Sequence, residues 1–198
     1  MFEEPEGATP LDPDEINGLK FKHLTTRGEL NELEQVNIQQ GLRWLQRRRT
    51  GDVLTDEFTR NLHTHLFGDV WSWAGSYRQT EKNIGIDPFQ IAVQLHELIE
   101  NTKYWVEHSI YTPLEAAARY HHRLTQIHPF VNGNGRHARI SADILLKDYY
   151  DHLPIDWAKG QNLEISGVRR NAYIKALRAA DAQRFDLLFE FVGLESRT

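Results

Sequence analysis

Hydrophobic residues recur at intervals of three and four along most of the chain, which is the spacing of helices that bury one face. This pattern covers residues 30–45, 89–108, 113–127, 135–150, 162–181 and 182–194, and a further helix is expected from about residue 55. No internal repeat interrupts this order. The pattern therefore predicts six or seven helices and an all-α fold.

Helix-breaking residues set the expected boundaries. Thr112 is a good N-cap, Pro113 suits a first turn, and Glu115 lies three residues after the cap, which predicts a capping box. Pro129 should end that helix and place His128 at its exit. The glycine- and aromatic-rich residues 68–90 predict a loop with a short β-hairpin around residues 77–86.

The first 18 residues contain Pro5, Pro10 and Pro13 and are expected to form an extended arm. The length of 198 residues fits one domain with a small appendage. We therefore predict residues 55–198 as the core domain and residues 1–54 as an N-terminal arm and helix with a regulatory role.

Composition narrows the classes of protein. The net charge of −5 gives no overall attraction to nucleic acid or anionic membranes. No apolar run approaches the roughly 20 residues that cross a bilayer, and the acidic N-terminus differs from a signal peptide. The chain has no cysteine, which excludes disulfides and thiolate chemistry. We expect a cytoplasmic protein without nucleic-acid or membrane partners; whether it forms homo-oligomers stays open.

The segment "HPFVNGNGRHAR", residues 128–139, carries the candidate chemistry. Its glycines let a ligand approach the backbone where the following helix begins, and helix N-termini bind anions. Arg136 and Arg139 project from one side of that first turn, although the macrodipole disfavours cations there. An anion between the two guanidinium groups resolves this conflict, and arginines clamp phosphate oxygens. The pattern thus predicts a polyphosphate site.

His128 stands beside this predicted site. A histidine can accept a proton from an incoming hydroxyl at neutral pH. The combination indicates phosphoryl or nucleotidyl transfer, with charge on the phosphates stabilised by the helix and the arginines. No P-loop sequence occurs, and the other histidines lack the spacing of a helical zinc site.

The segment "HPFVNGNGRHAR" resembles the Fic-family signature HPFx(D/E)GN(G/K)RxxR at all specified positions except one. "FGDVWSWAGSYR", "IGIDPFQI" and "RRNAYIKALRAAD" also resemble Fic-domain sequences, over roughly residues 55–195. With "ATPLDPDE" and "TTRGELNELEQ", the chain most resembles the Fic subgroup called mobile mystery protein B.

This resemblance implies a Fic-type helical bundle that transfers AMP from ATP to a Ser, Thr or Tyr hydroxyl of a target protein. It implies His128 as general base and an anion hole formed by Gly133, Asn134 and Gly135, with Arg136 on the β- or γ-phosphate and Arg139 on the γ-phosphate. Residues 79–87 would form a flap that holds the target by strand addition, through Thr80, Lys82, Asn83, Ile84 and Gly85.

Asn132 departs from the family pattern, because an acidic residue at this position holds Mg²⁺ in the family. A neutral amide oxygen is a weaker ligand for a hard cation, so Mg²⁺ or Mn²⁺ should bind less tightly. The family's inhibitory motif (S/T)xxxE(G/N) can be aligned with "TTRGELN", which suggests Glu29 as an inhibitory acid, although Leu30 breaks the last position.

Three alternatives remain open. The same fold can use another nucleotide or phosphoryl donor, or remove AMP. Gly135 argues against the phosphoryl-transferring Doc branch, because the resemblance implies a lysine at this position in that branch. The third alternative is a catalytically weak nucleotide-binding module of toxin–antitoxin type.

Overall fold

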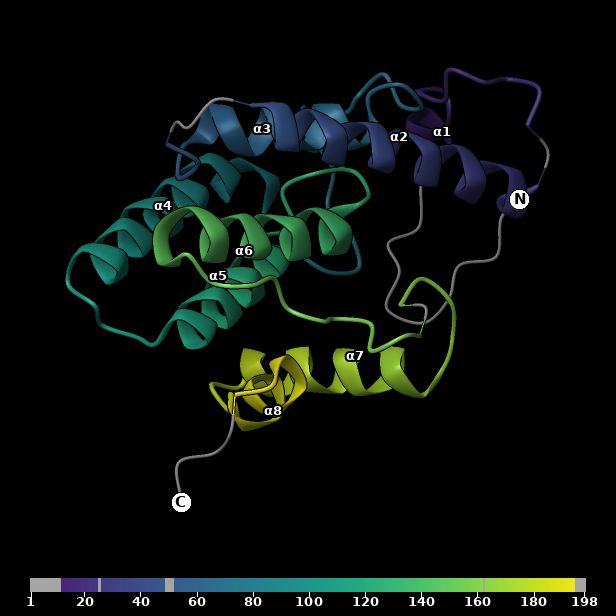
Figure 1. The fold of residues 1–198 in the computed structure, drawn as a ribbon. Helices are drawn as coiled ribbons and strands as arrows, with labels where there is room; N and C mark the ends of the chain where they lie inside the picture. The colour runs from purple at the N-terminus through teal and green to yellow at the C-terminus, as the bar shows by residue number, and fades with distance from the viewer. Residues whose placement is uncertain (1–11, 25, 49–51, 162, 195–198) are drawn as a thin grey trace.

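The structure is a computed structural model that describes residues 12–24, 26–48, 52–161 and 163–194 (Figure 1). Its helices are α1 (Pro13–Ile16), α2 (Arg27–Arg47), α3 (Asp56–Phe67), the 3₁₀ turn η1 (Pro88–Gln90), α4 (Ile91–Glu107), α5 (Pro113–Ile127), α6 (Asn134–Tyr150), α7 (Val168–Asp181) and α8 (Asp186–Val192). The predicted all-α class is confirmed. The N-terminal part of the predicted arm, residues 1–11, lies outside the described residues.

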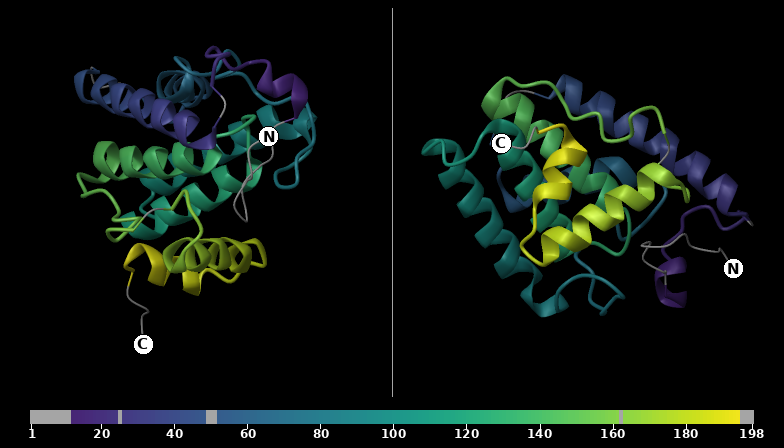
Figure 2. Two further views of the ribbon diagram at one scale, coloured as in Figure 1. Left: turned by 90° about the vertical axis from the view of Figure 1, so that its right-hand side faces the viewer. Right: turned by 90° about the horizontal axis from the view of Figure 1, so that it is seen from below.

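The helices stack in three layers, with α2 and α3 on one side, α4, α5 and α6 in the middle, and α7 and α8 on the other side (Figures 1 and 2). The larger hydrophobic cluster joins the middle layer to α7 and α8. A smaller cluster joins α2 and α3 to Ile144 of α6. The central pair α5 and α6 therefore packs on both sides, and the loop between these two helices is residues 128–133.

Side-chain caps explain several helix starts. The hydroxyls of Thr26 and Thr55 accept bonds from the main-chain N–H groups three residues ahead, at 3.3 and 3.0 Å. α5 begins after Thr112 as predicted, but the capping box is wrong. The Thr112 hydroxyl is buried without a hydrogen-bond partner. Glu115 instead pairs with Arg119 at 2.9 Å, one turn further along the helix.

The predicted β-hairpin around residues 77–86 is also wrong. This segment forms no ladder with itself; Tyr77 makes an isolated antiparallel bridge with Phe130. Arg78 N–H donates to the Pro129 oxygen at 3.0 Å, so the segment pairs with the α5–α6 loop. The Arg78 guanidinium donates hydrogen bonds to the main-chain oxygens of Thr80 and Ile86, which in a hairpin would accept bonds from the opposite strand.

In the described part of the chain, no helix has the length and apolarity needed to span a bilayer.

Candidate active site

His128 ends α5 in a left-handed conformation, with φ 54° and ψ 59°. The side chain is buried, and its Nδ1 lies 3.3 Å from the Thr125 oxygen. Burial lowers the pKa of His128 to about 4, the charges of Arg78 and Lys82 add to this lowering, and the Thr125 contact opposes it. The imidazole is therefore neutral at pH 7 and able to accept a proton.

The loop after His128 is closed by Asn134. Its Oδ1 accepts from the Phe130 N–H at 2.9 Å, and its Nδ2 donates to the Phe130 oxygen at 2.8 Å. The Phe130 ring is fully buried and stacks on His63 with centroids 3.8 Å apart. Asn134 was predicted in the anion hole. The structure shows its side chain bonded to Phe130, and a role of its main chain toward an anion stays a prediction.

Gly133 holds the turn that starts α6. Its φ of 77° lies in the left-handed region, and an added Cβ would come within 2.6 Å of the Phe67 ring. At Gly135 an added Cβ would lie 3.6 Å from a guanidinium nitrogen of Arg139, which is an ordinary contact. The turn therefore requires glycine at position 133, whereas at position 135 a Cβ meets no close contact.

Asn132 is engaged within the loop. Its Oδ1 accepts from the Gly133 N–H at 2.6 Å, and its main-chain oxygen lies 3.0 Å from Nε2 of His63. Across the described residues, no three or more His, Cys, Asp or Glu side chains gather as metal ligands. The residues present thus do not fit a magnesium ion held by the protein itself.

Both arginines of the first turn of α6 contact carboxylates. Arg136 Nη1 lies 2.7 Å from Glu34 of α2, and Arg139 Nη2 lies 2.6 Å from Glu164 in the loop before α7. Glu164 also reaches Nε of Arg136 at 3.6 Å. Trp71 Nε1 donates to Glu34 at 2.8 Å and fixes its carboxylate. The anions that the sequence pattern requires are present in the form of two glutamates.

Electrostatics agree with this pairing. Burial alone would raise the pKa of Glu164, but Arg136 and Arg139 hold it below its usual value. Behind Arg139, the Tyr173 ring centroid lies 5.5 Å from the guanidinium carbon. The Tyr173 hydroxyl lies 2.9 Å from Nε2 of His121. Arg139 is thus held between a carboxylate and an aromatic face.

Glu29, the predicted inhibitory acid, lies in the capping box of α2. Its carboxylate accepts from the Thr26 N–H at 3.0 Å and from the Thr26 hydroxyl at 2.9 Å. The carboxylate that contacts Arg139 belongs to Glu164. The inhibitory role of Glu29 stays a prediction.

The predicted flap, residues 79–87, is fastened to the end of α5 by Arg78. The Arg78 side chain is buried, and it donates to the His128 oxygen at 2.7 Å, the Thr80 oxygen at 2.9 Å and the oxygens of Ile86 and Ile127. An added Cβ on Gly85 would meet the His128 Cβ at 2.8 Å. The segment thus runs directly over the candidate base.

The other predicted flap residues lie on the same segment with different surroundings. Thr80 contacts Glu15 of α1, and Lys82 contacts both Glu15 and Asp12, the residue before α1. Ile84 is exposed, as is Asn83.

Sequence reasoning missed the roles of Arg78, Glu34 and Glu164. Glu34 meets its arginine across 102 residues, and no local pattern marks such a contact. Arg78 stood within "FGDVWSWAGSYR", but the sequence could not show that its charge turns inward. For Glu164, the arginine conflict at the start of α6 indicated that an anion was needed without indicating its source.

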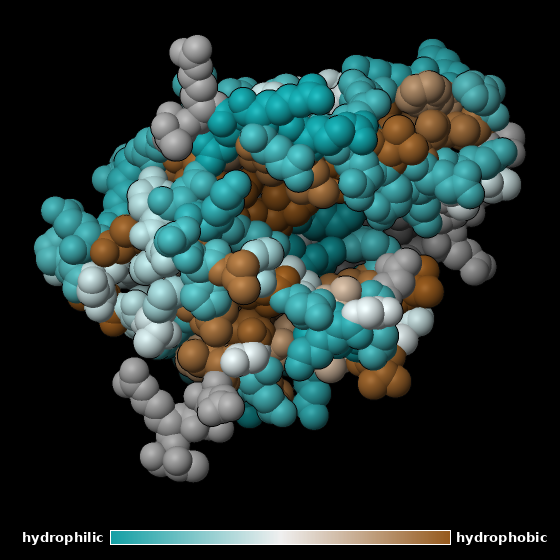
Figure 3. Space-filling model, in the orientation of Figure 1, coloured by the Kyte–Doolittle hydropathy of each residue, from teal (hydrophilic) through white to brown (hydrophobic). Residues whose placement is uncertain are grey.

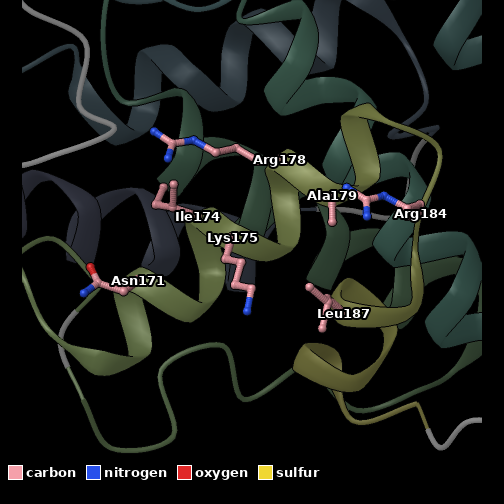
Figure 4. A pocket seen from close by; sticks show the side chains of 7 residues that line it. All are labelled: Asn171, Ile174, Lys175, Arg178, Ala179, Arg184 and Leu187. Carbon is pink, nitrogen blue, oxygen red and sulfur yellow. The ribbon is translucent and has the colours of Figure 1, made fainter.

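The surface is hollowed between α2 and α7, in front of the N-terminal end of α6 (Figure 3). A separate groove of about 500 Å³ lies between α7 and α8. Figure 4 shows the side chains that line it: Asn171, Ile174, Lys175, Arg178, Ala179, Arg184 and Leu187. None of these residues belongs to the segment 128–139.

A sequence model described as "Fic/DOC family" matches residues 53–146, the segment that carries this loop. These residues belong to the Fic/DOC family. The chain is also 29% identical to a Fido domain-containing protein of Dictyostelium discoideum over 111 residues, 54% of this chain and 71% of that protein. The resemblance to mobile mystery protein B stays a prediction.

Solved Fic structures share the fold. BepC of Bartonella tribocorum, determined with bound AMPPNP, has a TM-score of 0.69 at 17% identity and covers 94% of this chain and 100% of that chain. The N-terminal Fic domain of Bep8 from Bartonella sp. 1-1C has a TM-score of 0.71 at 13% identity, covering 88% of both chains.

Fic-1 of Caenorhabditis elegans has a TM-score of 0.60 at 23% identity over 80% of this chain. This chain spans 46% of that structure, so it corresponds to about half of it.

Proposed function

We propose that the Fic/DOC domain of this chain is a protein adenylyltransferase that transfers AMP from ATP to the hydroxyl of a Ser, Thr or Tyr side chain. The observation that carries the proposal is His128. It is a buried neutral imidazole placed six residues before a helix N-terminus that bears two arginines. Bound AMPPNP in the BepC structure supports a nucleoside triphosphate as the ligand.

In the proposed step, His128 accepts the proton of the acceptor hydroxyl. The hydroxyl oxygen bonds to the α-phosphorus, the bond from that phosphorus to the oxygen bridging to the β-phosphate breaks, and pyrophosphate leaves. The main-chain N–H groups of Asn134 and Gly135 and the guanidinium groups of Arg136 and Arg139 stabilise the negative charge. The Gly133 N–H, which donates to Asn132 Oδ1, joins them when the phosphates replace that acceptor. Mg²⁺ or Mn²⁺ enters as part of the nucleotide substrate.

The nucleotide must displace or rearrange Glu164 to reach Arg139. Their pair has one N–O distance of 2.6 Å, and a triphosphate offers the same guanidinium several oxygens. We therefore expect the wild-type chain to transfer AMP at a measurable but low rate, because Glu34 and Glu164 compete with the phosphates for the two arginines.

The test is incubation of the purified full chain with [α-³²P]ATP and, separately, [γ-³²P]ATP, with Mg²⁺ or Mn²⁺ and cell lysate, followed by gel autoradiography. Label from the α position on protein, and none from the γ position, is the expected result. Label from the γ position alone would replace the proposal by phosphoryl transfer. Absence of both labels in the wild type and in Glu164→Gln, with ATP bound in a parallel titration, would replace it by a binding module.

A further inference from the structure

The short helix α1 lies against the predicted flap. α1 lies at residues 13–16, far from the flap in sequence, and the Trp73 indole N–H donates to the Glu15 main-chain oxygen at 3.0 Å. The chain that follows is fixed as well, because Lys20 N–H donates to the Val70 oxygen at 2.9 Å. α1 is therefore held against residues 70–73 by the Trp73 side chain and by main-chain bonds of the residues that follow α1.

The side chains at this contact are complementary in charge. Lys82 Nζ lies 2.7 Å from the Asp12 carboxylate and also contacts the Glu15 carboxylate. The Thr80 hydroxyl donates to Glu15 at 3.2 Å. The Lys82 side chain is 3% exposed, whereas a lysine in an extended surface segment ordinarily keeps its ammonium in water. Two carboxylates take the place of that water.

Thr80 and Lys82 lie on one side of the segment, because both side chains contact the Glu15 carboxylate. Farther along the same segment, Gly85 packs against His128. Lys82 is also close enough to His128 to contribute to the lowering of its pKa. A peptide that binds to Thr80 and Lys82 therefore lies next to His128, the candidate base.

We propose that Thr80 and Lys82 form a docking surface for an acidic protein segment, and that α1 occupies this surface when no such segment is bound. The occupant that it fits carries two carboxylates three residues apart, as Asp12 and Glu15 do. Under the proposed function, on which this part rests, the acceptor protein presents such a segment beside its hydroxyl. It competes with α1 for the same lysine.

The first arm of the test measures docking without catalysis. Two synthetic peptides carry Asp-x-x-Glu or Asn-x-x-Gln beside an alanine that replaces the acceptor residue, and each is titrated into the ¹⁵N-labelled full chain by NMR. We expect the acidic peptide to shift amides of residues 79–87. It should bind the Asp12→Asn/Glu15→Gln variant roughly five- to tenfold more tightly than wild type, because two competing ion pairs are gone.

Lys82→Glu should reverse the preference, so that a peptide with Lys-x-x-Lys replaces the acidic one. This reversal would not follow from a merely structural role of Lys82. Glu100→Gln, which removes an exposed carboxylate paired with Lys103, is the matched control and should behave as wild type. Equal binding of the acidic and amide peptides, or an unchanged preference in Lys82→Glu, would overturn the proposal.

The second arm uses the same peptides with threonine in place of alanine and [α-³²P]ATP. Preferred labelling of the acidic peptide, enhanced in Asp12→Asn/Glu15→Gln, is the expected result. Amide shifts without label would leave the docking surface standing and overturn the adenylyltransferase assignment. Label that ignores the flanking charge would do the reverse.

Discussion

Arg78, beside His128, and the two arginines at the start of α6 differ in the groups that accept their hydrogen bonds. Arg78 is buried and donates to main-chain oxygens of Thr80, Ile86, Ile127 and His128. Arg136 and Arg139, at the start of α6, face the carboxylates of Glu34 and Glu164. Main-chain oxygens cannot leave, whereas a carboxylate can yield its place to a phosphate.

This difference separates an arginine with a structural role, Arg78, from the two arginines to which the proposed function assigns phosphate binding. Arg78 joins the segment before η1 to the end of α5 and so fixes the base and the flap relative to each other. Arg136 and Arg139 meet side-chain carboxylates, and the proposed function requires a phosphate to take the place of Glu164 on Arg139. Burial of a guanidinium alone therefore does not mark a binding residue, and the proposed function assigns that role to the two arginines whose acceptors are carboxylates.

Removing Arg78 should have the largest effect on stability. Arg78→Met keeps the length of the side chain but leaves four carbonyl oxygens without their donor, so we expect a loss on the order of 3–5 kcal/mol in the free energy of unfolding. Chemical denaturation measures it. Arg60→Met is the matched control, since Arg60 donates to the Gly75 oxygen, and should cost about 1 kcal/mol. Equal losses in both variants would break the distinction drawn for Arg78.

Acid should weaken the fold through the buried histidines. Burial lowers the pKa of His137 to about 4, as it does for His128, and also lowers the pKa of His63 and His121. In the unfolded chain these histidines bind protons near pH 6.5. Below that pH the unfolded state holds more protons, so the free energy of unfolding should fall by a few kcal/mol between about pH 6.5 and 4.

Denaturation midpoints measured across this pH range test that dependence. The histidine ring resonances in NMR should show His128 and His137 titrating near pH 4. Constant stability down to pH 4, or a titration of His128 near 6.5, would contradict the burial argument and remove the reason for a neutral base.

Removing a carboxylate-paired arginine should weaken nucleotide binding without a comparable loss of stability. For Arg139→Ala we expect ATP affinity to fall roughly 10- to 100-fold, because charge-assisted bonds to phosphate are lost. Isothermal titration calorimetry measures it. Arg184→Ala, which removes a cation from the groove between α7 and α8, is the control and should bind ATP as wild type does. Unchanged affinity in Arg139→Ala would place the phosphates elsewhere.

Removing the competing carboxylate should have the opposite sign. Glu164→Gln keeps the shape of the side chain and takes away its charge, so ATP should bind about three- to tenfold more tightly. Glu115→Gln, which removes a carboxylate from Arg119 in a similar pair, should leave ATP affinity unchanged. Weaker ATP binding in Glu164→Gln would show that Glu164 positions Arg139 and does not compete with phosphate.

The smallest effect is expected at Asn132. Asn132→Asp supplies the carboxylate that Mg²⁺ prefers, and we expect a gain of about two- to fivefold in the rate of AMP transfer at limiting Mg²⁺, about 1 kcal/mol or less. The comparison of rates at limiting and saturating Mg²⁺ measures it. No gain at any Mg²⁺ concentration would mean that position 132 does not contact the metal.

The sequence predicted the helices and the loop well because both rest on local rules. Pro129 and the glycines mark the end of α5 and the start of α6, and the arginine conflict in the first turn of α6 indicated an anion. The sequence could not predict the conformation of residues 77–86. Their pattern suits a hairpin, and only the fold shows that the buried Arg78 side chain binds the Thr80 and Ile86 oxygens instead. Nor could it name Glu34, which meets Arg136 from another layer of the fold.

The central claim is that His128 takes the acceptor proton in AMP transfer, and one measurement tests it directly. Wild type and His128→Ala are compared for incorporation of [α-³²P]ATP into protein at ATP concentrations that give both chains the same nucleotide occupancy by calorimetry. The account predicts label in the wild type and loss of at least about 100-fold in the variant, the scale of general base catalysis. Equal labelling of the two chains at equal occupancy would contradict it.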